Sequence, residues 1–238
     1  MAISRTRLDR FISEHCQVNR KAVRLYLAQQ RITVDGIIIK NVAHIVDKFS
    51  LICMDDKVLQ ANEARYIMLH KPIGVVSATK DEQHKTVIDL LPYSDKRELH
   101  IVGRLDLNTS GLVLLTNDSR WSEALTQPES KVEKVYQVTL KNPLTSDYIQ
   151  AFEQGMYFEY EGITTLPAKL RILTSHSAEV VLLEGRYHQI KRMFGRFRNP
   201  VVALHRSAIG QLSLDYSLKV GESRLLTSQE VAMINNNS

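Results

Sequence analysis

The 238-residue sequence lacks the common motifs of nucleotide, redox and hydrolase chemistry. It contains no Gly-x-x-x-x-Gly-Lys phosphate loop, no Gly-x-Gly-x-x-Gly turn and no Gly-x-Ser-x-Gly nucleophile elbow. Its eight histidines form no His-x-x-x-His or His-x-His pair, so the sequence gives no local support for a zinc site. These absences argue against nucleotide-driven, redox and metal-dependent reactions, and we expect neither a metal nor a cofactor.

Cysteine is scarce and long apolar runs are missing. The two cysteines, Cys16 and Cys53, have no metal-ligand spacing, and we expect both to be free thiols in a reducing compartment. No segment approaches the roughly 18–20 apolar residues that a membrane helix needs. The first residues also lack the apolar region of a signal peptide. We therefore expect a cytoplasmic protein that does not associate with membranes.

The positive charge is concentrated at the N-terminus. Residues 1–50 contain nine Lys or Arg and four Asp or Glu, whereas the rest of the chain contains 22 of each. A basic module attached to a neutral body is typical of proteins that dock on a polyanion, most simply a nucleic acid. A solvated basic face with no partner would give the same composition.

The N-terminal segment has the pattern of two helices followed by a hairpin. Leu8, Phe11 and Ile12 fall at helical spacing, and Asn19 is expected to cap a second helix. Asp35-Gly36, between two β-branched runs, predicts a type I′ turn. This pattern, over about residues 5–60, resembles the S4 RNA-binding domain. The basic residues that the helices offer to RNA are Arg7, Arg10, Arg20, Lys21 and Arg24.

A second, larger body is expected to follow a polar linker. We predict an RNA-binding domain at 1–60, a linker at 61–65, a catalytic domain at 66–234 and a disordered tail at 235–238. Strands are predicted from 66 and at 100–103, 112–116, 134–140, 168–173 and 179–183. Helices are predicted at 121–127, at 145–153 between a Thr145 cap and Gly155, and at 188–197. Strands of mixed spacing with scattered helices favour an α+β fold.

One carboxylate stands out as a candidate for catalysis. If residues 103–106 are extended, Arg104 and Asp106 point to the same face, and a neighbouring cation would keep the carboxylate ionised. A lone carboxylate beside a cation suits chemistry that needs one nucleophile or base. A surface ion pair worth less than about 1 kcal/mol would show the same spacing.

Two further segments carry residues suited to nucleic acid. From Arg186 to Arg206 there are six Lys or Arg and no acid. There, Arg186, His188 and Gln189 are candidates for substrate binding by charge or by hydrogen bonds to a base edge. Tyr136, on the same face as Lys134, could stack on a base. A solvated basic helix and ordinary sheet packing are the alternatives for these two segments.

Taken in order, five blocks of the sequence resemble the pseudouridine synthases, in particular the branch that carries an S4 domain and modifies ribosomal RNA. The blocks are Leu69-His70-Lys71-Pro72-Ile73-Gly74, residues 103–112 around Asp106, Lys134-Val135-Tyr136, residues 185–193 and residues 204–210. Any one block is moderately specific, whereas the ordered set is highly specific. The resemblance implies a mixed, mainly antiparallel sheet and favours the functional interpretations above over their alternatives.

The resemblance also implies roles for individual residues. Asp106 is expected to be the catalytic carboxylate, Tyr136 to stack on the uracil, and Lys191 to pair with Asp106. Leu183 and Ile190 are expected to form an apolar wall, and Arg104 to hold the opened RNA. Two positions depart from the family pattern: His70 replaces a common Asn and receives no role, and many relatives have Arg at position 191, where lysine lacks the bidentate fork.

The sequence therefore predicts a cofactor-free isomerase that converts a uridine of ribosomal RNA, most simply 16S, to pseudouridine. A 23S target is the nearest alternative. A non-catalytic RNA-binding factor in ribosome assembly is an alternative of another class. The expected partner is ribosomal RNA or a subunit precursor, and no interface pattern argues against a monomer.

Overall fold

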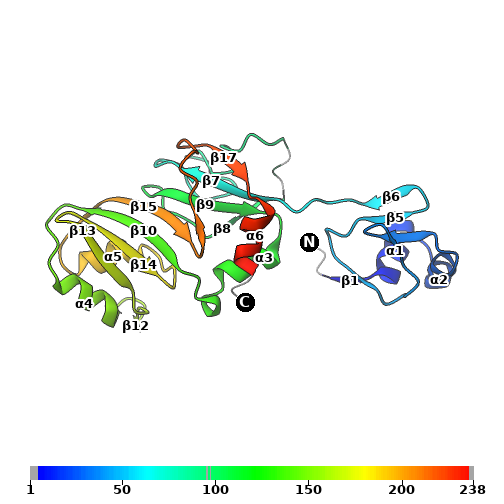
Figure 1. Cartoon of the computed structure of the whole chain (residues 1–238), viewed down its shortest axis with the longest axis horizontal. Helices are drawn as coiled ribbons and strands as arrows, with labels where there is room; N and C mark the ends of the chain where they lie inside the picture. Colours follow the sequence, from blue (N-terminus) through cyan, green and yellow to red (C-terminus); the bar gives the residue numbers. More distant parts are fainter. Residues whose placement is uncertain (1–4, 95, 97, 236–238) are drawn as a thin grey trace. The chain divides into compact units, whose positions relative to one another are not determined.

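The computed structural model describes residues 5–94, 96 and 98–235 and divides the chain into two compact units, residues 1–64 and 65–238. Figure 1 shows the helices and strands of both units. Residues 61–65, the predicted linker, contain no helix or strand. Of the predicted disordered tail, Asn235 is the last residue of a helix, and 236–238 lie outside the described residues.

The first unit packs two short helices on small antiparallel sheets. The helices are α1 (Leu8–Cys16) and α2 (Arg20–Ala28). One sheet has the order β3 (Ile37–Ile38), β2 (Ile32–Val34), β5 (Ile52–Met54), β6 (Lys57–Gln60); a second pairs β1 (Thr6–Arg7) with β4 (Ile45–Val46). The shared core consists of Leu8, Phe11, Ile12, Val23, Leu27, Ile32, Val34, Val46 and Ile52.

Local sequence signals in this unit act as predicted. The side chain of Asn19 caps α2 by accepting a hydrogen bond of 2.9 Å from the Ala22 amide. Asp35 and Gly36 both have positive φ, 52° and 79°, as a type I′ turn requires. The sequence pattern did not predict β5 and β6, which extend the sheet on the β2 side of the hairpin. Cys16 and Cys53 are free thiols.

The second unit is built on one mixed sheet, which confirms the α+β prediction. Its path is β13 (Lys169–Thr174), β14 (Ser177–Leu182), β10 (Lys134–Leu140), β15 (Val201–Ile209), β9 (Ser110–Thr116), β7 (Tyr66–Lys71), β17 (Ser223–Leu225). In addition, β16 (Leu212–Ser213) pairs with β15, and β8 (His100–Val102) pairs with β9. β15 and β9 are parallel, and the other pairs in this sheet are antiparallel.

Helices cover the sheet on both faces. α4 (Asp147–Gln154) and α5 (Gln189–Gly195) lie near β13 and β14, whereas α3 (Ser119–Thr126) and α6 (Ser228–Asn235) lie together beside β8 (Figure 1). In β7, Ile67 and Leu69 belong to one core, and Met68 belongs to the other. Because successive side chains of a strand point to opposite faces, a strand buried on both faces reads as a continuous apolar run. β9 follows the same rule.

Most predicted elements of this unit form within a few residues of their expected bounds. Thr145 is not the cap of α4, because the helix begins at Asp147 and its N-cap is Ser146, whose side chain makes no capping hydrogen bond. Gly155 does end the helix, with φ of 75°. The prediction missed β15, the nine-residue strand that joins the two halves of the sheet. It also missed β16, β17, α6 and two short strands, β11 (Tyr157–Phe158) and β12 (Ile163–Thr164).

The parallel pairing of β15 and β9 depends on one glycine. Gly111 lies opposite Arg206 in the ladder and has φ of 114°. A Cβ atom at Gly111 would lie 2.2 Å from the carbonyl oxygen of Arg206, which is far inside contact distance. Glycine is therefore required where β9 meets β15.

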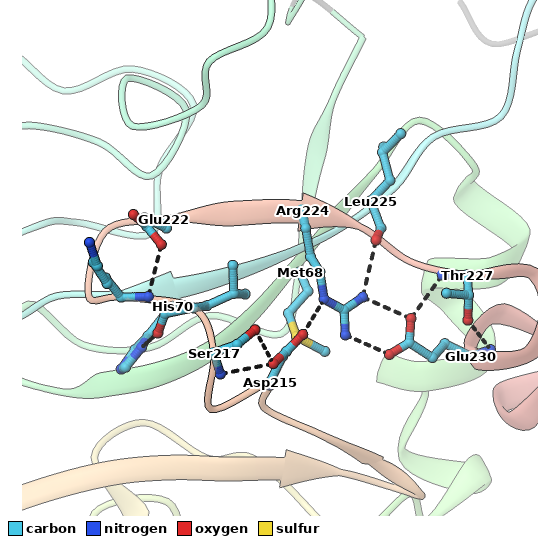
Figure 2. Close-up of polar contacts among 11 residues, drawn as sticks. Met68, His70, Asp215, Ser217, Glu222, Arg224, Leu225, Thr227 and Glu230 are labelled. Carbon is cyan, nitrogen blue, oxygen red and sulfur yellow. Dashed lines mark hydrogen bonds and ion pairs between the residues drawn. The ribbon is translucent and has the colours of Figure 1, made fainter.

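An ion-pair network around Arg224 links β17, at the edge of the sheet, to Asp215 and to α6 (Figure 2). Arg224 on β17 donates to Asp215 (2.6 Å) and, through both terminal nitrogens, to Glu230 on α6 (2.8 and 2.7 Å). Glu230 and Thr227 form a capping box, because each side chain accepts a hydrogen bond from the other's amide. Hydrogen bonds from the hydroxyl and the amide of Ser217, followed by the one from Arg224, hold the pKa of Asp215 at about 2. The contact with Arg224 is the main cause that holds the pKa of Glu230 at about 2, and the two carboxylates raise the pKa of Arg224.

This network should make stability depend on pH below about 4.5. Both carboxyl pKa values lie below their ordinary 3.8 and 4.5, so the unfolded chain binds more protons in this range. The stabilisation is therefore complete above about pH 4.5 and is lost as the pH falls toward 2. We expect Arg224→Met to lower the free energy of unfolding by about 1–3 kcal/mol at pH 7 and to reduce this acid dependence, chiefly the part due to Glu230, because Ser217 still binds Asp215.

Urea unfolding of both proteins at several pH values between 7 and 2.5 would measure this. Arg171→Met is the matched control, because Arg171 pairs with Glu179 at an exposed position, where ion pairs contribute little. Equal losses for the two variants would contradict a special role of the Arg224 network.

Candidate active site

Asp106 lies in an irregular loop between β8 and β9 and lines a cavity of about 240 Å³. The opposite wall comes from β10 and from the residues that lead into α5. The cavity brings together most of the predicted site: Asp106, Tyr136, Lys191, Arg104, Arg186, His188, Gln189 and Ile190. Segments separated by 85 positions in the sequence therefore meet around one carboxylate.

The loop that carries Asp106 is held by a buried lysine. Lys71, at the end of β7, is 0% exposed. Its ammonium group donates to the carbonyl oxygens of Asp106 (3.0 Å), Thr109 (2.8 Å) and Pro72 (2.9 Å), and it lies 3.5 Å from that of Leu107. Burial lowers the pKa of Lys71 from 10.5 to about 8; the negative charge of Asp106 opposes this shift and Arg206 adds to it.

A buried arginine and a serine hold the other half of the loop. Arg206 on β15 is 2% exposed and donates to the carbonyl oxygens of Gly103 (2.7 Å) and Leu112 (2.9 Å), with a longer contact of 3.5 Å to Arg104. The hydroxyl of Ser77 donates to the Leu105 carbonyl (2.8 Å) and accepts from the Leu105 amide (3.0 Å). The carbonyls of 103–107 and 109 thus all have partners, as buried backbone groups require.

The carboxylate of Asp106 faces two groups from the α5 segment. Its Oδ2 accepts a hydrogen bond from Lys191 Nζ at 3.2 Å and lies 3.4 Å from His188 Nε2. The three side chains are 30–37% exposed, so the carboxylate is open to a substrate. Arg104 lines the cavity but makes no ion pair with Asp106 among the described residues. The cation next to the carboxylate is therefore Lys191, 85 residues away in sequence.

The turn before α5 is built to present His188. His188 is the N-cap of α5 and has a left-handed backbone, with φ of 49°, which is uncommon for a residue other than glycine. Gln189 is 3% exposed; its amide accepts from the Arg186 backbone (3.1 Å) and donates to Glu184 (2.8 Å). The side chain of Gln189 thus fixes the turn, in addition to lining the cavity.

Strands β10 and β14 contribute lining residues to the cavity. Lys134 and Tyr136 both line it, and Tyr136 is 8% exposed. Burial, reinforced by the charge of Arg206, lowers the pKa of Lys134. Leu182 lines the cavity in place of the predicted Leu183. The correction follows from the alternation of β14, which turns Leu182 inward and leaves Leu183, just past its end, half-buried.

The predicted RNA-binding residues of the first unit are not equally available. Arg7 pairs with Asp9 at 2.8 Å, and Arg10 pairs with Glu14 at 2.8 Å. Three other basic residues lie exposed along α2; they are Arg20, Lys21 and Arg24.

Sequence reasoning missed the two buried cations, Lys71 and Arg206, as parts of the site. Both stand in sequence blocks that resemble the family, but their partners are backbone carbonyls, which leave no side-chain signal in the sequence. Among residues 5–94, 96 and 98–235, no cluster of three His, Cys, Asp or Glu could hold a metal ion. In the same part of the chain, no helix is long and apolar enough to cross a membrane.

Comparison with known proteins gives consistent matches. Residues 65–195 match the family model described as RNA pseudouridylate synthase. The chain is 45% identical, over 96% of its length and 100% of the relative's, to ribosomal small subunit pseudouridine synthase A of Pseudomonas aeruginosa. It is 40% identical, over 96% and 99%, to the Escherichia coli K12 protein of the same name. A crystal structure of a pseudouridylate synthase matches with a TM-score of 0.70 and 38% identity, over 96% and 99% of the two chains.

The position of Lys71 generates a prediction about stability. Lys71→Met keeps an unbranched side chain but removes the donors to three carbonyls, and we expect it to lower the free energy of unfolding by about 2–4 kcal/mol at pH 7. In the wild type the folded pKa of about 8 lies below the ordinary 10.5. The unfolded chain therefore binds more protons between these values, and wild-type stability rises with pH across this window.

Urea unfolding at pH 7, 8.5 and 10 would test both expectations, and Lys71→Met should lack the pH-dependent gain. Lys169→Met is the control, because Lys169 forms an exposed pair with Glu133. A Lys71→Met protein as stable as this control would show that the loop does not depend on the ammonium group.

Proposed function

The chain belongs to the RNA pseudouridylate synthase family, and from this premise we propose that Asp106 is the carboxylate with which it converts a uridine of small-subunit (16S) ribosomal RNA to pseudouridine. The observation that carries the proposal is the loop of residues 103–109. Its carbonyls are held by buried groups while the one carboxylate it bears faces a cavity. A carboxylate preorganised in this way needs little rearrangement to act on a substrate.

The reaction conserves every atom of the substrate. The C1′–N1 bond of the uridine breaks, the base turns within the site, and C5 bonds to C1′ while C5 gives up a proton and N1 gains one. No electron donor or acceptor and no group carrier is needed, so we propose that the protein uses no cofactor. Ordinary glycosidases use two carboxylates, one of which protonates the leaving group or activates water. One suffices when the leaving uracil stays in the site and returns as the nucleophile.

Asp106 supplies covalent or base catalysis at the ribose, and the groups around it have complementary roles. Lys191 balances the charge of the carboxylate, at 3.2 Å. Tyr136 offers the face on which the uracil stacks. Leu182 and Ile190 form the apolar wall that keeps water away from the broken glycosidic bond, because hydrolysis there would release the base.

The lining of the cavity fits a polyanionic substrate. Asp106 is the one acidic residue among its lining residues, whereas the basic ones are Arg104, Lys134, Arg186, Lys191 and Arg206. We propose that the first unit is an S4-type module that docks RNA through the exposed basic residues of α2. The similarity to ribosomal small subunit pseudouridine synthases A favours small-subunit over large-subunit (23S) RNA. The chain is proposed to act as a monomer on the RNA or on a subunit precursor.

Replacing the carboxylate tests the mechanism. We expect Asp106→Asn to abolish tritium release from small-subunit rRNA carrying 5-tritiated uridine, by at least about 1,000-fold, because the amide can neither attack nor accept a proton. Asp147→Asn, at an exposed position on α4, is the control and should keep full activity. An Asp106→Asn protein as active as the wild type would refute the mechanism, whereas an inactive wild type that binds the RNA would favour the assembly-factor alternative.

Arg104 is expected to hold the opened RNA. It is exposed beside Asp106, and a guanidinium group can stack on a base and bind phosphate together. Extruding a base from a helix costs a few kcal/mol, so the benefit should appear on structured RNA. We expect Arg104→Ala to lower kcat/KM about 100-fold on folded rRNA and at most about 10-fold on a short unstructured RNA.

Tritium release on both RNAs, with Arg171→Ala on β13 as the matched surface control, measures the difference. Equal losses on folded and unstructured RNA would show that Arg104 does not act in opening the helix.

A further inference from the structure

Asp106 also lines a second cavity. It measures about 360 Å³ and shares six lining residues with the first cavity: Arg104, Leu105, Asp106, Gly185, Arg186 and His188. Residues found only in the second are Val76, Ser77, Leu107 and Tyr187. Pockets of roughly 300–1,000 Å³ are large enough for a small molecule or a nucleotide. The second cavity therefore adjoins the first at these shared residues, and the proposed reaction gives no role to the residues that line only the second.

The second cavity has an aromatic platform at its edge. The side chain of Tyr187 is large and aromatic, and yet it is 73% exposed. Its ring stacks on that of His188, with centroids 3.9 Å apart and planes at 18°. His188 reaches this position through its left-handed backbone, a conformation that costs energy and persists where the surroundings impose it. The exposed face of Tyr187 can therefore add a third planar group to an existing stack.

Charge at this cavity favours a nucleotide over a neutral ring. Arg104 is exposed and Arg186 is 40% exposed in its side chain, where it pairs with Glu184 at 2.8 Å. Asp106 is again the one acid among the lining residues. A stacking face flanked by guanidinium groups is the combination with which proteins hold single-stranded nucleic acid.

We propose that this second cavity binds the nucleotide that adjoins the target uridine in the RNA strand, with its base stacked on Tyr187 and its phosphate beside Arg104 and Arg186. This inference rests on the proposed function. The two cavities adjoin at Asp106 and at the other lining residues that they share, so a nucleotide next to a uridine in the first cavity lies within reach of the second. The bound neighbour fixes the ribose of the target over the carboxylate.

A double-mutant cycle between the protein and the RNA tests this site. The target uridine is first mapped with the wild-type protein, and the substrate is then prepared with an abasic residue at its 5′ or its 3′ neighbour. Tyr187→Ala, Tyr187→Phe and the control Tyr216→Ala, an exposed tyrosine elsewhere in the same unit, are compared with the wild type. The readouts are the half-saturating RNA concentration and the maximal rate of tritium release.

We expect Tyr187→Ala to raise the half-saturating concentration about 10-fold with the maximal rate within about 2-fold. Tyr187→Phe and Tyr216→Ala should match the wild type, because stacking needs the ring but not the hydroxyl. An abasic neighbour on one side should cost the wild type about 10-fold and Tyr187→Ala almost nothing, because both changes remove the same stack.

Two results would overturn the inference. Penalties for the abasic residue and for Tyr187→Ala that multiply independently, at both neighbours, would show that Tyr187 does not contact a flanking base. A lower maximal rate with an unchanged half-saturating concentration would show that Tyr187 acts only by positioning His188. Absence of tritium release from the wild type is a distinct failure, since it would refute the proposed function itself and this inference with it.

Discussion

The geometry of the candidate site depends on hydrogen bonds that two buried cations donate to backbone carbonyl oxygens. Between Gly103 and Thr109 the chain leaves regular structure, and its carbonyls lose the ladder partners that β8 and β9 would give them. Lys71 and Arg206 replace those partners, and each is almost completely buried. Burying a cation costs free energy, but removing it would leave several buried carbonyl groups without a hydrogen-bond partner. The shape of the loop, and with it the position of Asp106, follows from these two side chains.

The sheet explains why the two cations can reach the same loop. Lys71 ends β7 and Arg206 lies on β15, and these strands flank β9, whose first residue follows the loop directly. The parallel pairing of β15 with β9 brings Arg206 opposite Gly111, where the absence of a Cβ lets the strands approach. The apolar residues of β7 and β9 bury both faces of this region. The register of β7, β9 and β15 thus determines where Lys71 and Arg206 lie relative to the loop that carries Asp106.

The sequence predicted local structure where a single residue or a short period decides it. Asn19 and the Asp35-Gly36 turn have conformational preferences of their own, and the apolar run that opens at Tyr66 reads as a strand without further context. β15 was missed because Val201–Ile209 continues a basic segment and mixes polar with apolar residues. The motifs contained most of the residues that line the cavity, but they could not show whether Leu182 or Leu183 faces it. That choice depends on where β14 ends, which sequence patterns place only within a few residues.

The backbone and the carboxylate of Asp106 contact different groups, and this separation has a chemical consequence. Asp106 is positioned through its backbone, by Lys71, while its carboxylate contacts Lys191 and His188 from a different element, α5. The backbone of Asp106 is therefore held independently of the charge partners of its carboxylate. A carboxylate that acts on a ribose must exchange contacts with a cation for contacts with the substrate, and it can do so here without disturbing the loop. Rigid support with exchangeable partners is what a single catalytic carboxylate needs when no second acid or metal shares the work.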